Sequence, residues 1–165
     1  MAKQLLLVRH GKSDWGNLDL KDFDRPLNKR GKENAPEMAG RLLNKGFKFD
    51  LMVSSPAKRA KTTAKYFAEA YKTEQIQFEE AIYEADSKTL LRIINSLNNE
   101  ANTVIMFGHN PGFTDLANAL SDADLYNIPT AGMVLISFPF ESWTMVSKGT
   151  GEMIFFDYPK NSDEM

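Results

Sequence analysis

The two histidines of the chain each follow an unbroken run of apolar residues. Leu5-Leu6-Leu7-Val8 leads into Arg9-His10-Gly11, and the run at residues 103–107 leads into Gly108-His109-Asn110. Apolar runs without polar alternation are typical of strands that are buried on both faces. Ligands of open α/β sheets bind at the carboxyl ends of such strands. If the two strands are neighbours, we expect both imidazoles to meet in one crevice beside Arg9. A strand-end histidine that only caps a turn is the alternative.

Many cationic side chains lie in the first 61 residues, whereas the whole chain has a formal net charge of −2. A solvated surface explains most runs of charge, but a basic pocket in an acidic protein suits a small anion. The cations considered for such a pocket are Arg9, Lys12, Lys21, Arg25, Lys29, Arg30, Lys58, Arg59 and Lys61.

The sequence lacks the common motifs for metal and nucleotide binding. It has no HExxH, no third histidine and no cysteine from which to build a standard metal site. A Walker loop, a GxGxxG and a GxSxG elbow are also absent. We therefore expect no metal and no cofactor. A metal protein that uses only the two histidines remains an alternative.

Length and composition bound the class of protein. The 165 residues and the 42% hydrophobic fraction are typical of one globular domain with a substantial core. We expect a single domain over residues 1–160 and a frayed tail over 161–165. No apolar run approaches the ~18 residues of a membrane span, and the first strand follows Met1 too closely for a signal peptide. The expected location is cytoplasmic, with no membrane partner, and the net charge argues against nucleic-acid binding.

Strand and helix patterns alternate along the chain, which predicts a three-layer α/β domain with a largely parallel central sheet. The C-terminal strands follow each other too closely for crossover helices, so we expect antiparallel pairing at the edge. Lys12–Arg30 is expected to be an ordered loop, and the only long one near His10. The later strands are expected at Leu51–Ser54, Ile76–Phe78, 103–107, Met133–Phe138 and Gly151–Tyr158, with Trp143–Ser147 as a further candidate. The helices are expected to follow Asn28, Ser55 and Ser87 as N-caps, with a fourth after Gly112.

Four segments, in this order along the chain, resemble the signature of the histidine phosphatase superfamily, whose fold is phosphoglycerate-mutase-like. Arg9-His10-Gly11 resembles its RHG motif, and Gly108-His109-Asn110 resembles its second-histidine element. Residues Asp24–Gly31 resemble its D-x-P-L-[ST]-x-x-G segment, and Ser54–Ala64 resemble its S-S-P-x-x-R-A-x-x-T-A helix entry. The short chain and the sequence from Arg9 to Trp15 most resemble the compact SixA-type phosphohistidine phosphatases.

The resemblance implies that His10 attacks phosphorus through a neutral ring nitrogen and forms a phosphohistidine intermediate. Arg9, Arg59 and His109 would bind the phosphoryl oxygens, whose charge must be neutralised in the transition state. Arg59 lies near a helix N-terminus, which also favours anions; without the motif, a surface arginine is the alternative. His109 would donate to a phosphate oxygen, with a protonated ring as one option.

The general acid is the least specified of the implied residues. Glu84 is the positional candidate for the carboxylate that many relatives carry near the third strand, with Asp86 and Asp14 as further candidates. A phosphohistidine substrate releases imidazole, which is a better leaving group than an alkoxide. Such an enzyme could therefore work with a poor acid or none, and Glu84 would then only orient groups or bind substrate.

Two departures from the mutases favour a more open phosphatase. Gly16 stands where mutases commonly carry an asparagine, six residues after the histidine, and the chain lacks the length of the mutases. The leading hypothesis is a metal-independent phosphatase that acts on a phosphohistidine protein or on a small phosphomonoester, with its oligomeric state left open. The alternative is a non-catalytic phosphate-binding or phosphoprotein-binding module, but His10 weighs against it because binding alone needs no nucleophile.

Overall fold

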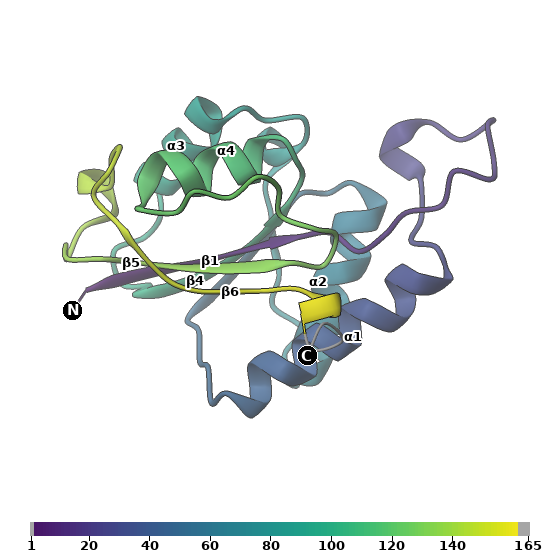
Figure 1. Cartoon of the computed structure of the whole chain (residues 1–165), viewed down its shortest axis with the longest axis horizontal. Helices are drawn as coiled ribbons and strands as arrows, with labels where there is room; N and C mark the ends of the chain where they lie inside the picture. Colours follow the sequence, from purple (N-terminus) through teal and green to yellow (C-terminus); the bar gives the residue numbers. More distant parts are fainter. Residues whose placement is uncertain (1, 162–165) are drawn as a thin grey trace.

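The computed structural model describes residues 2–161, which form an α/β fold around one six-stranded sheet (Figure 1). The strand order is β3-β2-β4-β1-β5-β6. The first four strands in this order are parallel, and β5 and β6 pair antiparallel to their neighbours. This confirms the predicted fold class. The strands are β1 (Lys3–Arg9), β2 (Leu51–Ser54), β3 (Gln77–Phe78), β4 (Thr103–Gly108), β5 (Met133–Phe138) and β6 (Glu152–Asp157).

Helices cover both faces of the sheet, with α1 (Lys29–Asn44) and α2 (Lys58–Ala70) on one face and α3 (Ser87–Asn95) and α4 (Gly112–Leu120) on the other (Figure 1). Leu5 and Leu7 of β1 are buried in the core beneath α3 and α4. Leu6 and Val8 are buried in the core beneath α1 and α2. Both faces of β1 are therefore buried in the hydrophobic core, which explains its unbroken apolar run. Within residues 2–161, no helix combines the length and apolar character needed to cross a membrane.

The helix starts agree only in part with the predicted caps. Asn28 caps α1 as expected, since its side chain accepts a hydrogen bond from Gly31 N at 2.8 Å. The prediction of Ser55 as the cap of α2 is wrong, because α2 begins three residues later, after Ala57. Asp86, and not Ser87, caps α3, because its carboxylate accepts from Thr89 N at 2.9 Å.

The candidate strand at Trp143–Ser147 is also wrong, because a short 3₁₀ helix, η3 (Trp143–Met145), stands there. Trp143 is fully buried and its indole N–H donates to Ala101 O at 2.7 Å. The Asn95 side chain donates to the carbonyls of Trp143 and Val146. These side chains donate hydrogen bonds to backbone carbonyl groups that would otherwise need the hydrogen bonds of a neighbouring strand. Of the predicted tail, Asn161 ends η4 (Pro159–Asn161) and residues 162–165 lie outside the described residues.

Helix α1 packs closely against the segment that follows His10. A Cβ atom on Gly31 would lie 2.2 Å from the carbonyl oxygen of Lys12, whereas a Cβ on Gly40 of the same helix would meet nothing within 4 Å. We expect Gly31→Ala to lower the free energy of unfolding by about 1–3 kcal/mol through this overlap. Gly40→Ala should instead raise it by about 0.5–1 kcal/mol, because alanine favours helix. Urea unfolding of both variants checks this, and equal stabilities would contradict the close packing.

Candidate active site

The two histidines meet at the carboxyl ends of neighbouring parallel strands. β1 pairs with β4 in a register that places Arg9 opposite Gly108, so His10 and His109 follow at the same edge. The centroids of their rings are 5.3 Å apart. Both side chains are buried, with 7% and 8% of their surfaces exposed. The structure thus brings together the pair that the two apolar runs predict.

The contacts of His10 identify which ring nitrogen carries the proton. Nδ1 lies 2.6 Å from the carbonyl oxygen of Gly11. A carbonyl oxygen can only accept, so Nδ1–H is the donor and Nε2 holds the lone pair. The Nε–H of Arg59 donates to Nε2 at 3.3 Å. Nε2 is therefore the ring nitrogen whose lone pair could attack an electrophile, and it lies directly beside a guanidinium.

Burial and the surrounding cations keep His10 neutral. Burial lowers its pKa from 6.5 to about 3, and the charges of Arg59 and Arg9 act in the same direction, while the hydrogen bond to Gly11 opposes them. In the folded protein without a bound anion, the ring thus carries only its Nδ1 proton and is neutral throughout the neutral pH range. A neutral ring with a free lone pair is the form that can attack phosphorus.

Helix α2 and the turn after β1 are linked through Thr63. Its hydroxyl accepts from Gly11 N at 2.9 Å and donates to Arg59 O at 2.8 Å. The turn that carries His10 and the helix turn that carries Arg59 are therefore held by one side chain. This contact explains in part how Arg59, a buried side chain of α2, reaches Nε2.

His109 is fixed by a residue that the sequence analysis assigned only as a helix cap. Its Nε2 lies 2.8 Å from Ser55 Oγ, and Ser55 Oγ also accepts from Ala57 N at 3.2 Å. Nδ1 of His109 is buried and has no hydrogen-bond partner within residues 2–161. Burial lowers the pKa of His109 to about 4, with Arg59 adding to this effect and Asp22 opposing it. The ring is therefore neutral without an anion, and a protonated ring while His109 donates to a phosphate oxygen remains a prediction.

Arg9 is held by a second loop, which corrects the expectation of only one long loop near His10. Its Nη1 donates to the carbonyl of Ile128 at 2.8 Å, in the segment 121–132 between α4 and β5. Its Nε is buried without a hydrogen-bond partner in the described part of the chain. Burial, followed by the charge of Arg59, lowers the pKa of Arg9. The nearby Arg9 and Arg59 thus form the cationic centre of the site.

The loop after His10 reaches back over Arg59, a contact that the sequence analysis missed. We call residues 13–27 the strap. Its ends meet at the bridge between Ser13 and Leu27, and it carries the short helix η1 (Asp22–Asp24). Asp22 accepts from Arg59 Nη2 at 3.0 Å, from Arg25 Nη2 at 2.8 Å and from the Tyr83 hydroxyl at 2.6 Å. No motif or periodicity marked Asp22 or Tyr83 as site residues.

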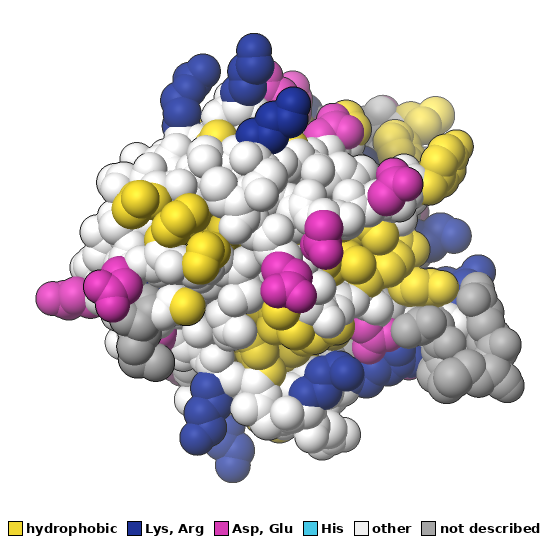
Figure 2. Space-filling model, turned by 60° about the vertical axis from the view of Figure 1, so that its left-hand side comes forward, with side chains coloured by type: hydrophobic (Ala, Val, Ile, Leu, Met, Phe, Trp, Pro, Cys, Tyr) yellow, Lys and Arg dark blue, Asp and Glu magenta, His cyan; other side chains and the backbone are white. Residues whose placement is uncertain are grey.

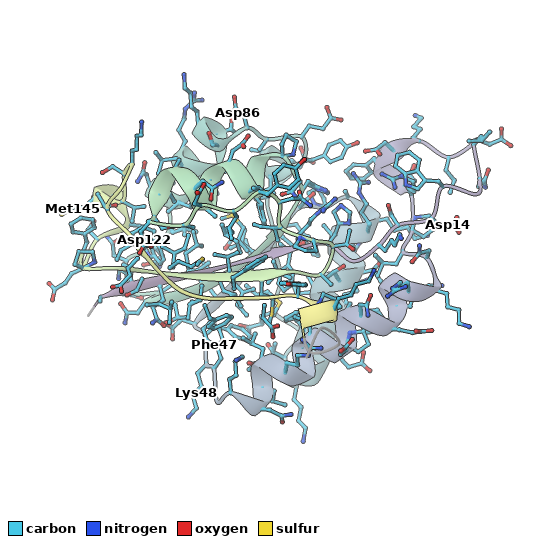
Figure 3. All side chains as sticks on the ribbon, viewed as in Figure 1. Asp14, Phe47, Lys48, Asp86, Asp122 and Met145 are labelled. Atoms are coloured by element: carbon cyan, nitrogen blue, oxygen red, sulfur yellow. The ribbon has the colours of Figure 1, made fainter. Side chains whose placement is uncertain are left out.

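The three candidate acids lie in different settings, and Figure 3 labels two of them, Asp14 and Asp86. Glu84 is exposed on the turn after η2 (Glu80–Ile82), next to Tyr83. Asp14, at the base of the strap, accepts from Gly16 N at 2.7 Å, and Asp86 caps α3. Asp14 and Asp86 are thus occupied by local turns. Glu84 remains the candidate.

Of the predicted basic pocket, the structure brings three arginines to the histidine pair: Arg9, Arg25 and Arg59. The remaining cations are exposed, apart from the partly buried Lys61. The face drawn in Figure 2 mixes hydrophobic, acidic and basic side chains and shows no histidine, as expected for two buried rings. Among the described residues, no group of three or more metal-ligating side chains occurs.

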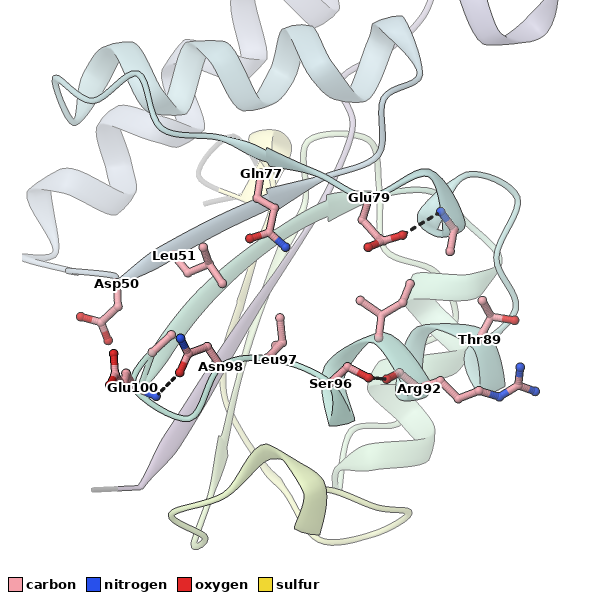
Figure 4. Close-up of a pocket in the computed structure, with 13 residues that line it drawn as sticks. Asp50, Leu51, Gln77, Glu79, Thr89, Arg92, Ser96, Leu97, Asn98 and Glu100 are labelled. Atoms are coloured by element: carbon pink, nitrogen blue, oxygen red, sulfur yellow. Dashed lines mark hydrogen bonds between the residues drawn. The ribbon is translucent and has the colours of Figure 1, made fainter.

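A separate cavity of about 740 Å³ lies beside α3, where residues of β2 and β3 complete its lining (Figure 4). Asp50, Leu51, Arg92 and Leu97 are among its lining residues. None of the residues of the histidine pair or of the strap belongs to this lining. The candidate site is therefore distinct from this cavity.

Comparisons with known proteins agree with the arrangement of the site. Residues 5–111 match the model of the histidine phosphatase superfamily (branch 1). An uncharacterised chloroplast protein of Arabidopsis thaliana is 29% identical over 153 residues, which cover 87% of this chain and 70% of that protein. The structure of a protein described as phosphohistidine phosphatase SixA from Agrobacterium tumefaciens superposes with a TM-score of 0.80, 26% identity and coverage of 96% and 99%. A mycobacterial glucosyl-3-phosphoglycerate phosphatase shares the fold, with a TM-score of 0.70, 15% identity and coverage of 96% and 100%.

Proposed function

Because the chain belongs to the histidine phosphatase superfamily and is a phosphatase with a phosphoglycerate-mutase-like fold, we propose that it removes phosphate from phosphohistidine on another protein. The covalent intermediate is phospho-His10. The observation that carries this proposal is the unprotonated Nε2 of His10, which accepts a hydrogen bond from Arg59 Nε–H at 3.3 Å at the edge where β1 and β4 end. A binding module would need the cations but not this nucleophile.

Four groups are proposed to bind and activate the phosphoryl group. Arg59 and Arg9 neutralise its oxygens. Ser55 donates its hydroxyl proton to His109 Nε2, so that Nδ1–H of His109 donates to a phosphoryl oxygen. The buried Nδ1 without a protein partner supports this role. The charge of the bound phosphoryl group would raise the pKa of His109, because opposite charges at close range favour the ionised form.

The same contacts support the second half of the reaction. Phosphorylation of Nε2 leaves the proton on Nδ1, where the carbonyl of Gly11 already accepts it at 2.6 Å. This hydrogen bond stabilises the phosphorylated ring in its protonated form. Water then attacks phosphorus, the P–Nε2 bond breaks, and His10 departs as neutral imidazole with its Nδ1–H unchanged, while both protons of the water remain on the released dihydrogen phosphate. We propose that no metal and no cofactor takes part in either step.

Leaving-group chemistry favours phosphohistidine over alkyl phosphates as the substrate. An alkoxide needs a proton in the transition state, but Glu84 is exposed and, within residues 2–161, forms no hydrogen bond with His10, Arg59 or His109. A protonated phosphohistidine ring needs no such proton. The 26% identical structure described as SixA supports the same substrate class.

A comparison of three substrates tests the proposal. Phosphate release is followed from a histidine-phosphorylated protein, from 4-nitrophenyl phosphate and from a small sugar phosphate, each with and without EDTA. We expect the phosphohistidine protein and the aryl phosphate to exceed the sugar phosphate in kcat/KM, and EDTA to leave all rates unchanged. Glu84→Gln should slow the sugar phosphate about tenfold or more, since acid catalysis contributes 10²–10⁴-fold where it operates, and should slow phosphohistidine less than twofold.

Glu80→Gln is the matched control, because Glu80 is an exposed glutamate of the preceding η2. It should leave all three substrates unaffected. A strong preference for the sugar phosphate, with equal damage by Glu84→Gln on every substrate, would identify a metabolite phosphatase instead. Loss of activity in EDTA that a divalent ion restores would contradict the absence of a metal.

A further inference from the structure

Asp22 lies beside the nucleophile although it belongs to none of the matching motifs. Its Oδ2 accepts from Arg59 Nη2 at 3.0 Å and its main-chain carbonyl accepts from Nη1 at 2.7 Å. The same guanidinium donates its Nε–H to His10 Nε2. The Arg59 guanidinium therefore lies between the Asp22 carboxylate and His10 Nε2, the atom proposed to attack phosphorus. The imidazole of a phosphohistidine substrate that binds next to His10 would thus lie within reach of Asp22.

The Asp22 carboxylate is ionised and oriented. Burial alone would raise its pKa, but hydrogen bonds from Tyr83 and Arg25 and the charge of Arg59 hold its pKa well below the usual range. These three groups face it from the turn after η2, from the strap and from α2, and His109 lies behind Tyr83 at a ring distance of 5.6 Å. A carboxylate held in this state accepts hydrogen bonds and is a poor acid.

The carboxylate has a free acceptor position. Two carboxylate oxygens offer about four lone-pair positions. Three are used, because Oδ1 accepts from Arg25 and Oδ2 accepts from Arg59 and Tyr83. The side chain is 47% exposed. Of the acceptor positions on Oδ1, one is thus left unused by residues 2–161 and can accept from a donor on a substrate.

The strap does not depend on Asp22 alone for its position. Its base is closed by the bridge between Ser13 and Leu27 and by the hydrogen bond from Asp14 N to Pro26 O at 2.8 Å. Phe23 packs edge-on against Tyr83, with centroids 5.2 Å apart. A negative charge beside a phosphate-binding arginine repels every phosphate substrate. A substrate that offers Asp22 a proton donor would offset this repulsion.

We propose that Asp22 recognises the leaving group of a phosphohistidine substrate, by accepting a hydrogen bond from the ring N–H opposite the phosphorylated nitrogen. This inference rests on the proposed function and assigns it a specificity-determining residue. The hydrogen bond keeps the substrate ring protonated. As Nε2 of His10 bonds to phosphorus, the substrate P–N bond breaks and its electron pair returns to the ring. The ring departs as neutral imidazole, and no proton has to be transferred.

The two imidazoles of the reaction are then treated alike. The substrate ring gives its remote N–H to the Asp22 carboxylate, and His10 gives its own remote N–H to the Gly11 carbonyl. Each ring is held protonated while it carries phosphorus and is neutral when it leaves. The leaving group of 4-nitrophenyl phosphate has no hydrogen-bond donor, so this substrate experiences only the repulsion of Asp22.

Asp22→Asn tests the proposal, with Asp24→Asn as the control of equal charge on the same short helix. Asparagine retains the size of the side chain and can still accept from Tyr83. We expect Asp22→Asn to lower kcat/KM for a histidine-phosphorylated protein by about tenfold, and to raise it for 4-nitrophenyl phosphate by about twofold to fivefold. The alkaline limb of the phosphohistidine pH profile should shift about one pH unit lower, because the carboxylate no longer holds the ring protonated.

The control and a second variant distinguish recognition of the substrate ring by Asp22 from a role of Asp22 in holding the strap in place. Asp24→Asn should leave both substrates unchanged. Tyr83→Phe removes a strap contact and keeps the carboxylate, so the preference of the enzyme for phosphohistidine should persist. Equal losses on both substrates in Asp22→Asn, or loss of the preference in Tyr83→Phe, would overturn the inference in favour of a strap anchor. Failure of the unsubstituted protein to hydrolyse phosphohistidine would instead overturn the proposed function.

Discussion

Replacing His10 with alanine is expected to lower kcat/KM at least about 10³-fold on every substrate, because the variant has no atom to form the covalent intermediate. The neutral ring, its Nδ1–H bonded to Gly11 and its Nε2 facing Arg59, is the basis of this expectation. Phosphate release from a histidine-phosphorylated protein and from 4-nitrophenyl phosphate measures the loss.

The loss must be separated from unfolding. His10 follows β1, whose core residues Leu5–Val8 are fully buried and unaffected by the substitution. The thermal unfolding midpoint of His10→Ala should therefore stay close to that of the unsubstituted protein. A folded variant that retains a tenth or more of the original rate would contradict the role of His10.

The second large effect is expected from Arg59→Ala. We expect kcat/KM to fall about 10²-fold to 10³-fold, as when one preorganised donor of a transition-state charge is removed. Arg59 also shares the carboxylate of Asp22 with Arg25, so its loss would leave that carboxylate with one cation fewer beside the bound phosphate. Steady-state kinetics with 4-nitrophenyl phosphate measures this fall in kcat/KM. Its leaving group has no hydrogen-bond donor, so a hydrogen bond to Asp22 does not contribute.

Lys58→Ala is the matched control, because Lys58 is the exposed neighbour of Arg59 on α2. It should change the rate less than twofold. Arg59→Lys keeps the charge but cannot span His10 and Asp22 with one planar group, so its rate should lie between those of the alanine variant and the unsubstituted protein. Equal rates for Arg59→Ala and Lys58→Ala would show that Arg59 does not bind the phosphoryl group.

The sheet and the histidine pair could be predicted because their signals are local. Residues 5–8 and 103–107 are unbroken apolar runs, and each is followed at once by its histidine. Parallel strands of an α/β domain end at the same edge, so adjacency of β1 and β4 was enough to bring His10 and His109 together.

The polar partners of the site could not be predicted, because they depend on tertiary contacts. Asp22 meets Tyr83 across 61 positions, and Ser55 meets His109 across 54. Ser55 before a proline has the composition of a helix cap, but α2 starts later and frees its hydroxyl for the imidazole. In the same way, burial of Trp143 overrides the strand propensity of its segment.

Covalent trapping tests the central claim most directly. The protein is mixed for milliseconds with a phosphohistidine protein that carries labelled phosphate, quenched in alkali to preserve phosphohistidine, and mapped by mass spectrometry. We predict label on His10 alone, and none in His10→Ala. Label on His109, or complete turnover with no labelled enzyme and no burst of released product, would contradict a phospho-His10 intermediate.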